Sequence, residues 1–215
     1  MEIKHKGIKL QYDADYYVTN GLESVSGFEI KVANKDRTTM EYHKVLIYLI
    51  DYIFNTKAVI KPEQTIAYYS WLLKFVPSSD SCYDLWEFVN EDGMFTEGIE
   101  YSANLIQMQE KVCNSKNTKT LFPFFGQKVA ISRGVYEGMD CEGVRYPSPD
   151  HMTGWYITTD QYDGNFQSLM VVHYYHLAFK RTDLLPYLAL PYGFRFSKYE
   201  SKIEVWLDST IQEYE

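Results

Sequence analysis

The alternation of apolar and polar residues predicts strands at the start of the chain. Residues 3–12 and 24–33 both show strand-like alternation, in which one face is apolar and the other polar. Asn20 and Gly21 lie between them and form a dipeptide that is typical of tight turns. We therefore expect a β-hairpin within this part of the chain.

Helical spacing of apolar residues follows. Thr38 and Glu41 have the capping-box spacing that begins a helix. The apolar stripe after them consists of Val45, Leu46, Leu49, Ile50, Ile53 and Phe54. Pro62 suits the first turn of a second helix, which Pro77 ends. The apolar face of that helix consists of Tyr68, Trp71, Leu72 and Phe75. A short strand at 85–89 and a third helix over 97–113 complete a half that we expect to be helix-rich.

The polar segment 114–120 has no apolar periodicity and is the best candidate for a linker or exposed loop. The strands predicted beyond it are 128–132, 144–146, 155–159, 194–196 and 203–207. A helix is predicted over 166–179, and a short one from Thr182 to Leu188. We divide the chain into an N-terminal α+β region, 1–118, and a C-terminal α+β domain, 119–215. The predicted class is α+β, with a mixed or antiparallel sheet flanked by helices.

Charge and cysteine content narrow the classes of function. The formal net charge is −8, which opposes binding to nucleic acid or to an anionic membrane surface. The three cysteines lie far apart and include no C-x-x-C pair, which is typical of free thiols in a reducing compartment. The N-terminus lacks the apolar segment of a signal peptide, and no apolar run is long enough to span a bilayer. We therefore expect a cytoplasmic protein.

No residue pattern points firmly to catalysis or to a cofactor. The glycines form neither a dinucleotide-binding motif nor a phosphate-binding loop, and the serines lie in no nucleophile elbow. His173 and His176 are three residues apart on a predicted helix, so both imidazoles would lie on one face. A metal-dependent hydrolase that uses them is an alternative, and it needs a third ligand. The candidates for this ligand are His151, Asp160 and Asp163. We predict a protein that is not an enzyme and that holds no cofactor.

An acidic segment offers a candidate binding site. Between Phe75 and Glu110 there is no Lys or Arg, whereas acidic residues recur and aromatic residues lie among them. Such a segment attracts a basic partner, and aromatic side chains often anchor interfaces. The predicted partner-binding residues are Asp84, Trp86, Glu87, Glu91, Asp92, Phe95 and Glu97.

The segment 129–208 resembles a known family. Its landmarks are ISRGV at 131–135, HMTGWYITTD at 151–160, YDGN at 162–165, RTD at 181–183, YLALPYGFRF at 187–196 and VWLD at 205–208. This order and spacing resemble a bacterial family of immunity proteins from polymorphic toxin systems. The resemblance implies a cytoplasmic protein that binds a cognate toxin and blocks it. We expect it to act by occlusion, with its acidic, aromatic surface covering the toxin's active site or substrate groove. A structural or oligomeric adaptor is the remaining alternative, and the oligomeric state is left open.

Within that segment, several landmarks also fit structural roles. Gly154 before Trp155 suits a close approach of two backbones at the start of a strand. Four arginines have acidic residues available as partners that would organise the ends of the sheet and helix. The arginines are Arg133, Arg145, Arg181 and Arg195, and the acids are Asp160, Asp163, Asp183 and Asp208.

Overall fold

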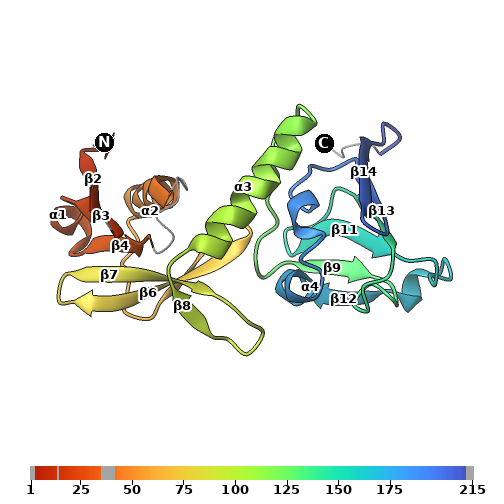
Figure 1. Cartoon of the computed structure of the whole chain (residues 1–215), viewed down its shortest axis with the longest axis horizontal. Helices are drawn as coiled ribbons and strands as arrows, with labels where there is room; N and C mark the ends of the chain where they lie inside the picture. Colours follow the sequence, from red (N-terminus) through yellow and green to blue (C-terminus); the bar gives the residue numbers. More distant parts are fainter. Residues whose placement is uncertain (1–2, 14, 35–41, 212–215) are drawn as a thin grey trace. The chain divides into compact units, whose positions relative to one another are not determined.

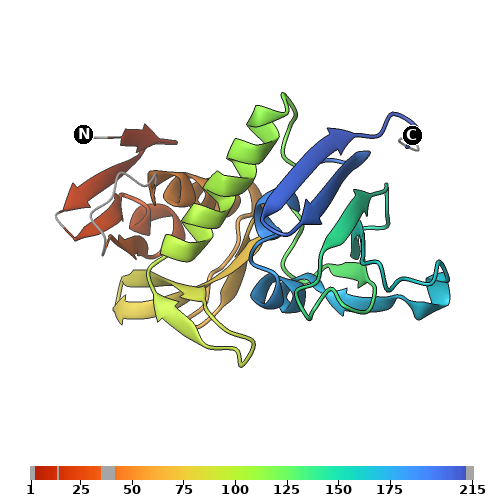
Figure 2. The ribbon, with the colours of Figure 1, turned by 45° about the vertical axis from the view of Figure 1, so that its right-hand side comes forward.

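The computed structural model describes residues 3–13, 15–34 and 42–211 and divides the chain into two compact units (Figure 1). The N-terminal unit is Met1–Asn104 and the C-terminal unit is Leu105–Glu215. The boundary lies inside helix α3 (Glu100–Ser115), a continuous helix (Figure 2), whereas the sequence analysis divided the chain after residue 118. Within the described ranges, no helix is long and apolar enough to cross a membrane.

The N-terminal unit is built on a strand-rich sheet. Its strands are β1 (Ile3–His5), β2 (Ile8–Asp13), β3 (Tyr16–Asn20), β4 (Glu29–Ala33), β5 (Thr65–Tyr68), β6 (Trp71–Ser79), β7 (Cys82–Phe88) and β8 (Phe95–Glu97). They pair in the order β1-β2-β3-β4-β7-β6-β5, and β8 also pairs with β7. The β4–β7 pair is parallel and the others are antiparallel, so the sheet is mixed. A short helix, α1 (Glu23–Ser26), precedes β4.

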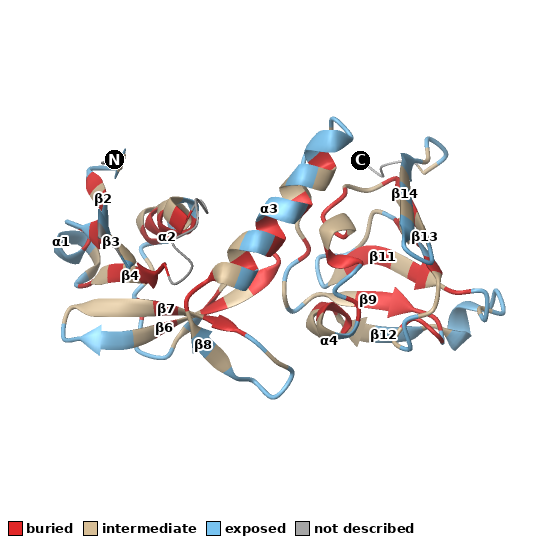
Figure 3. Cartoon of the chain, viewed as in Figure 1, coloured by how far each residue is buried: buried red, intermediate tan, exposed pale blue. Residues whose placement is uncertain are grey.

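Helix α2 (Tyr42–Thr56) confirms the first predicted helix and provides much of this unit's core. Its buried side chains are Tyr42, Val45, Leu46, Leu49, Ile50 and Ile53, which form a stripe along one face (Figure 3). The predicted capping box, Thr38 and Glu41, lies outside the described residues. Trp71, Leu73 and Phe75 are fully buried on β6, where they follow the two-residue period of a strand.

The prediction of a helix-rich N-terminal half is wrong. The structure is 36% strand and 24% helix, and the N-terminal half consists mainly of strands. The predicted helix between Pro62 and Pro77 is instead the hairpin of β5 and β6. Tyr69 has a φ of 50°, which turns the chain between the paired residues Tyr68 and Trp71. The predicted hairpin of 3–12 with 24–33 is also wrong, because β3 lies between β2 and β4.

The C-terminal unit contains most of α3, from Leu105 onward, and a six-stranded mixed sheet. Its strands are β9 (Lys128–Ile131), β10 (Cys141–Arg145), β11 (Met152–Thr158), β12 (Met170–His173), β13 (Phe194–Tyr199) and β14 (Lys202–Leu207). They pair in the order β12-β9-β11-β10-β13-β14, and β9 and β11 are parallel. The remaining elements are η1 (Phe166–Ser168), α4 (Tyr174–Lys180) and η2 (Leu185–Tyr187).

The helix predicted over 166–179 divides into three elements. The segment begins as the 3-10 turn η1, continues as the edge strand β12 and becomes helical in α4. Asn165 stabilises η1, because its side chain accepts a hydrogen bond from the Gln167 N–H at 3.0 Å. The valines at 171 and 172 favour an extended backbone, which accounts for the strand within the apolar run.

Candidate partner-binding face of the C-terminal sheet

Side chains along β10 and β11 alternate between the two faces of the C-terminal sheet, and one of these faces packs into the core. Gly143 lies opposite Ile157, and Arg145 lies opposite Trp155. Trp155 and Ile157 are fully buried. The Trp155 Nε1–H donates a hydrogen bond to the Leu188 carbonyl oxygen at 2.9 Å, so this face meets the segment that contains η2.

The opposite face of the same strands, which we call the open face, carries aromatic and apolar side chains. Val144 lies opposite Tyr156 on β11 and opposite Arg195 on β13, and Arg195 lies opposite Trp206 on β14. Trp206 is 41% exposed, and Val144 and Tyr156 are half-buried. The outer face of an antiparallel sheet is commonly polar, so aromatic residues on the open face point to contact with a partner.

An apolar hollow of about 410 Å³ lies on the open face. It is lined by Val144, Tyr146, Tyr156, Thr158, Tyr162, Gly164, Phe166 and Leu169. The ring of Tyr156 meets the rings of Tyr146 and Phe166 edge-on, at centroid distances of 5.6 and 6.4 Å. Phe166 is 75% exposed, so its ring lies at the rim of this hollow. The hollow has the size and aromatic lining of a site for an apolar anchor side chain.

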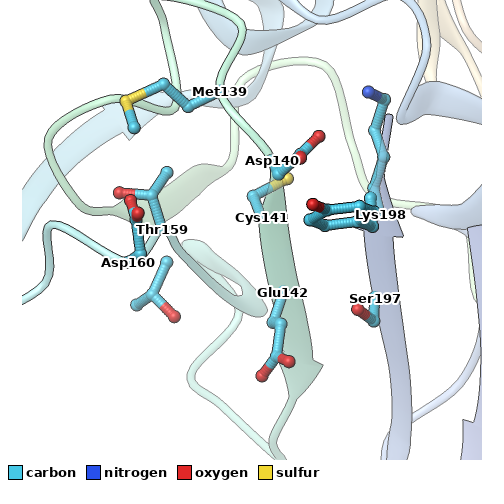
Figure 4. A pocket seen from close by; sticks show the side chains of 10 residues that line it. Met139, Asp140, Cys141, Glu142, Thr159, Asp160, Ser197 and Lys198 are labelled. Carbon is cyan, nitrogen blue, oxygen red and sulfur yellow. The ribbon is translucent and has the colours of Figure 1, made fainter. Parts of the chain in front are cut away.

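A polar hollow of about 470 Å³ shares Thr158 with the apolar hollow and is therefore its neighbour. Asp140, Glu142 and Asp160 line it, together with Lys198 (Figure 4). The Lys198 amine points away from Glu142, donates to the Glu200 carbonyl oxygen at 2.7 Å and lies 3.6 Å from an Asp183 carboxylate oxygen. The amine is therefore engaged elsewhere, and Glu142 and Asp160 give this hollow an acidic character.

Cys141 also lines the polar hollow but is poorly suited to nucleophilic chemistry. Its side chain is 3% exposed, and burial raises the pKa of the thiol, although Arg181 beside it acts in the opposite direction. Burial also raises the pKa of Cys82, and it raises the pKa of Cys113 to about 11. These thiols stay protonated at neutral pH, whereas a cysteine nucleophile needs a thiolate.

The binding residues predicted from the sequence lie on or next to the β7–β8 hairpin of the N-terminal unit. Trp86 pairs with Glu97, and Phe95 pairs with Phe88. Because Asp84, Trp86 and Phe88 alternate along β7, the structure brings Asp84, Trp86, Phe95 and Glu97 to one face of the sheet. Glu91 and Asp92 are exposed in the turn between the two strands. The role of these residues stays a prediction.

Lysines from neighbouring strands offset part of the acidity of this hairpin. The Lys31 amine on β4 lies 3.2 Å from an Asp84 carboxylate oxygen. The Lys74 amine on β6 lies 4.9 Å from the centre of the Phe95 ring and 2.7 Å from a Glu63 carboxylate oxygen. A segment without Lys or Arg in the sequence thus gains cations from elsewhere in the fold, which weakens the electrostatic argument for it.

Glu87 lies on the opposite, buried face of β7 and is 2% exposed. Its carboxylate accepts hydrogen bonds from the N–H groups of Tyr101 and Ser102, at 2.9 and 2.7 Å, and from the Ser102 hydroxyl at 2.8 Å. Tyr101 and Ser102 lie in the first turn of α3, so Glu87 caps this helix from a neighbouring strand. The carboxylate is therefore engaged in holding the fold.

The two histidines of the metal-site alternative are not on one helix face. His173 ends β12, and His176 lies in α4, with 6.2 Å between the ring centres. The His173 Nδ1 lies 3.2 Å from the Gly126 carbonyl oxygen. A search of the described residues finds no group of three or more His, Cys, Asp or Glu residues able to hold a metal ion.

The residues of the apolar hollow were not among the binding residues predicted from the sequence. Val144 and Tyr156 lay in predicted strands, but an alternating pattern does not say which face a helix will cover. A signal was present at Phe166, because a large apolar residue directly follows the turn residues Asp163, Gly164 and Asn165. Such a position is exposed unless another element covers it.

Comparison with known proteins supports the family resemblance of the C-terminal part of the chain. The family model of the Imm33-like domain matches residues 108–208, and its name is that of an immunity-protein family. No curated protein and no solved structure matches the chain. The resemblance to an immunity-protein domain over 129–208 is thereby confirmed, and the segment that matches the Imm33-like domain model lies within the C-terminal unit.

Proposed function

We propose that the chain is an immunity-type inhibitor that binds a protein toxin through the open face of its C-terminal sheet. The observation that carries this proposal is the position of the two hollows within the segment that matches the Imm33-like domain. The inhibitor acts by occlusion, because the toxin surface bound to this face is no longer accessible to the toxin's substrate.

The chemistry of the open face defines the surface that it would accept. The apolar hollow beside Tyr156 and Phe166 suits a large apolar side chain, and the neighbouring acidic hollow beside Glu142 and Asp160 suits a Lys or Arg. A toxin surface with an apolar anchor next to a basic residue would fit both. A stable complex would bury about 1,200–2,000 Å² in total, so residues around the hollows would also take part.

The test begins with toxin domains from the same genome as this chain. Each is expressed in a sensitive host with and without the chain, and growth identifies the toxin that the chain neutralises. Binding is then measured by calorimetry with the purified pair. We expect Phe166→Ala to weaken binding about thirtyfold, which corresponds to roughly 2 kcal/mol for an interface anchor. We expect Glu142→Lys to weaken it as well, by placing a cation in the acidic hollow.

A matched control distinguishes the two candidate surfaces. Glu91→Lys combined with Asp92→Lys reverses two exposed charges in the β7–β8 turn and leaves the C-terminal sheet unchanged. If this variant loses binding while Phe166→Ala and Glu142→Lys retain it, the hairpin predicted from the sequence is the binding site and the open face is not. If no toxin domain is neutralised by the wild-type chain, the immunity function itself is contradicted.

A further inference from the structure

The three edge strands β5, β14 and β12 differ in whether their outward backbone groups are hydrogen-bonded, and this difference suggests a second interaction surface. The outer edge of a sheet carries unpaired N–H and C=O groups, which pair readily with another strand unless something covers them. On β5, the Tyr48 hydroxyl donates to the Ala67 carbonyl oxygen at 2.9 Å. On β14, the Lys116 amine donates to the Val205 carbonyl oxygen at 2.9 Å.

Both capped carbonyls point away from the sheet. In an antiparallel pair, alternate residues bond to the neighbouring strand and those between them point outward. The Asp208 N–H donates to the Gly193 carbonyl oxygen. In the β13–β14 pair, the backbone N–H and C=O of Trp206 therefore point toward β13, and those of Val205 point away from it. The Phe75 N–H donates to the Gln64 carbonyl oxygen. By the same alternation along β5, the backbone N–H and C=O of Ala67 point away from β6. Lys116 and Tyr48 therefore cap true edge positions.

No side chain among the described residues caps the edge strand β12 in this way. The Tyr174 N–H donates to the Gln127 carbonyl oxygen, and Val172 lies opposite Val129, so Val172 bonds inward and Val171 points outward. Among the hydrogen bonds between described residues, none occupies the outward N–H or C=O of Val171. Each group therefore has a free place for a strand from outside.

The side chains along this edge are apolar. Met170 is 43% exposed and Val171 is 57% exposed, and β12 contains no Lys, Asp, Glu or Pro of the kind that discourages pairing. Phe166, which is 75% exposed, precedes the strand. Phe124 is 59% exposed, and its turn lies at the far end of β12, where Phe125 stacks on Tyr175 at 5.1 Å. Both ends of the strand thus carry an exposed phenylalanine.

We propose that β12 pairs with β12 of a second copy of this chain. With a two-fold axis at Val171, the N–H and C=O of this residue bond to the C=O and N–H of its counterpart, which joins the two C-terminal sheets. The antiparallel arrangement brings the Phe166 end of one strand to the Phe124 end of the other. Self-complementary hydrogen bonding and apolar residues at both ends favour a second copy as the occupant. This pairing goes beyond the proposed function. It does not involve Val144 or Tyr156, but it shares Phe166 with the rim of the apolar hollow.

The test is the mass of the full chain in solution, measured by sedimentation or light scattering up to about 500 µM, because a short strand buries little area and gives a weak dimer. We expect the mass to rise from 25.3 kDa toward twice that value as concentration increases. Hydrogen exchange provides a second readout, in which the outward amide of Val171 becomes protected only at the higher concentrations.

Lysine variants locate the contact. Val171→Lys should hold the chain at the mass of one copy, because it places two cations opposite each other. Thr65→Lys places the same side chain at an exposed position of the capped edge β5 and should dimerise as the wild type does. If Val171→Lys does not fold, Met170→Lys replaces it. A wild-type chain that keeps the mass of one copy throughout, or a dimer that persists in the folded β12 variant, would overturn the proposal.

Discussion

Glu87 serves the fold, although its place in the sequence suggested a role in binding. The acidic segment 76–109 shows where negative charges lie along the chain, but the two-residue period of β7 decides which of them reach solvent. Asp84 and Trp86 lie on one face of the strand, and Glu87 lies on the other, beside the first turn of α3. A binding site inferred from charge alone therefore includes a residue that has a structural task.

The buried carboxyl of Glu87 should make stability depend on pH. Burial raises its pKa above the ordinary 4.5, although the hydrogen bonds from Ser102 and Tyr101 act in the opposite direction. A raised pKa means that the folded state binds the proton more tightly, so the contribution of this group to stability is lost as the pH rises above 4.5. We therefore expect the stability of Glu87→Gln, relative to wild type, to improve between acidic and neutral pH.

Urea unfolding of both proteins across this pH range measures the effect. Glu87→Ala should lose about 2 kcal/mol at every pH, because it leaves two N–H groups in the first turn of α3, one of them buried, without their acceptor. A stability difference between wild type and Glu87→Gln that does not change with pH would contradict the assigned role of the carboxyl.

The buried guanidinium of Arg145 has hydrogen-bond acceptors that the sequence did not reveal. We expected an acidic partner, as found for Arg181 with Asp183 and for Arg195 with Asp208. The Arg145 guanidinium instead donates to backbone carbonyl oxygens, at distances between 2.6 and 3.2 Å. These acceptors belong to Leu121, Thr153, Leu188 and Leu190. Burial lowers its pKa to about 10, so the group stays charged at neutral pH. It holds two loop segments to the sheet, one that contains Leu121 and one that contains Leu188 and Leu190.

At the scale of elements, the hairpin of β5 and β6 explains the main error of the sequence analysis. Tyr68, Trp71, Leu72 and Phe75 fit a helical stripe, yet Trp71 and Phe75 equally fit alternation along a strand. The turn at Tyr69 has no glycine to mark it, so the sequence does not show the break between the two strands. Apart from β12, which was predicted as part of a helix, the short C-terminal strands were easier to predict, because β-branched and aromatic residues are frequent in them.

The binding face was harder to predict than the strands that form it. Alternation in β11 correctly separates Trp155 and Ile157 from Tyr156, but both sets are apolar or aromatic. Which set is buried depends on where η2 and the adjoining loops lie, and the contact between Trp155 and the Leu188 carbonyl crosses 33 residues of sequence. The open face is therefore a property of the assembled unit.

A substitution at Gly154 can test the close approach of two backbone segments at the start of β11. Its φ is +81°, and a Cβ at this position would meet the carbonyl oxygen of Tyr146. Gly154→Ala should therefore destabilise the chain by about 3 kcal/mol, from the unfavourable φ and the collision together. Gly164→Ala is the matched control, because its φ of +79° is similar and a Cβ there meets nothing within 4 Å. Thermal unfolding should show a clearly smaller loss for Gly164→Ala, and equal losses would mean that the close approach has no cost.

At the scale of the whole molecule, the family match and the fold divide the chain at nearly the same place. The Imm33-like segment begins at residue 108, and the C-terminal unit begins at Leu105. Helix α3 contributes to both units, and its two ends are held by different means. Glu87 caps its first turn, whereas the Gln109 side chain and the Cys113 thiol donate to the carbonyl oxygens of Leu185 and Ala189 in the C-terminal unit.

This division predicts that local damage stays within one unit. Capping acts within the first turn of a helix, so Glu87→Ala should increase amide exchange in the N-terminal unit and leave the core of the C-terminal unit protected. Arg145→Met should do the reverse, because every carbonyl that Arg145 binds lies in the C-terminal unit. Hydrogen exchange on the full chain compares the two variants, each serving as the control for the other. If either substitution increases amide exchange equally in both units, α3 transmits the loss of stability and the chain unfolds as one cooperative body. Substitutions in the N-terminal unit would then also weaken the binding face.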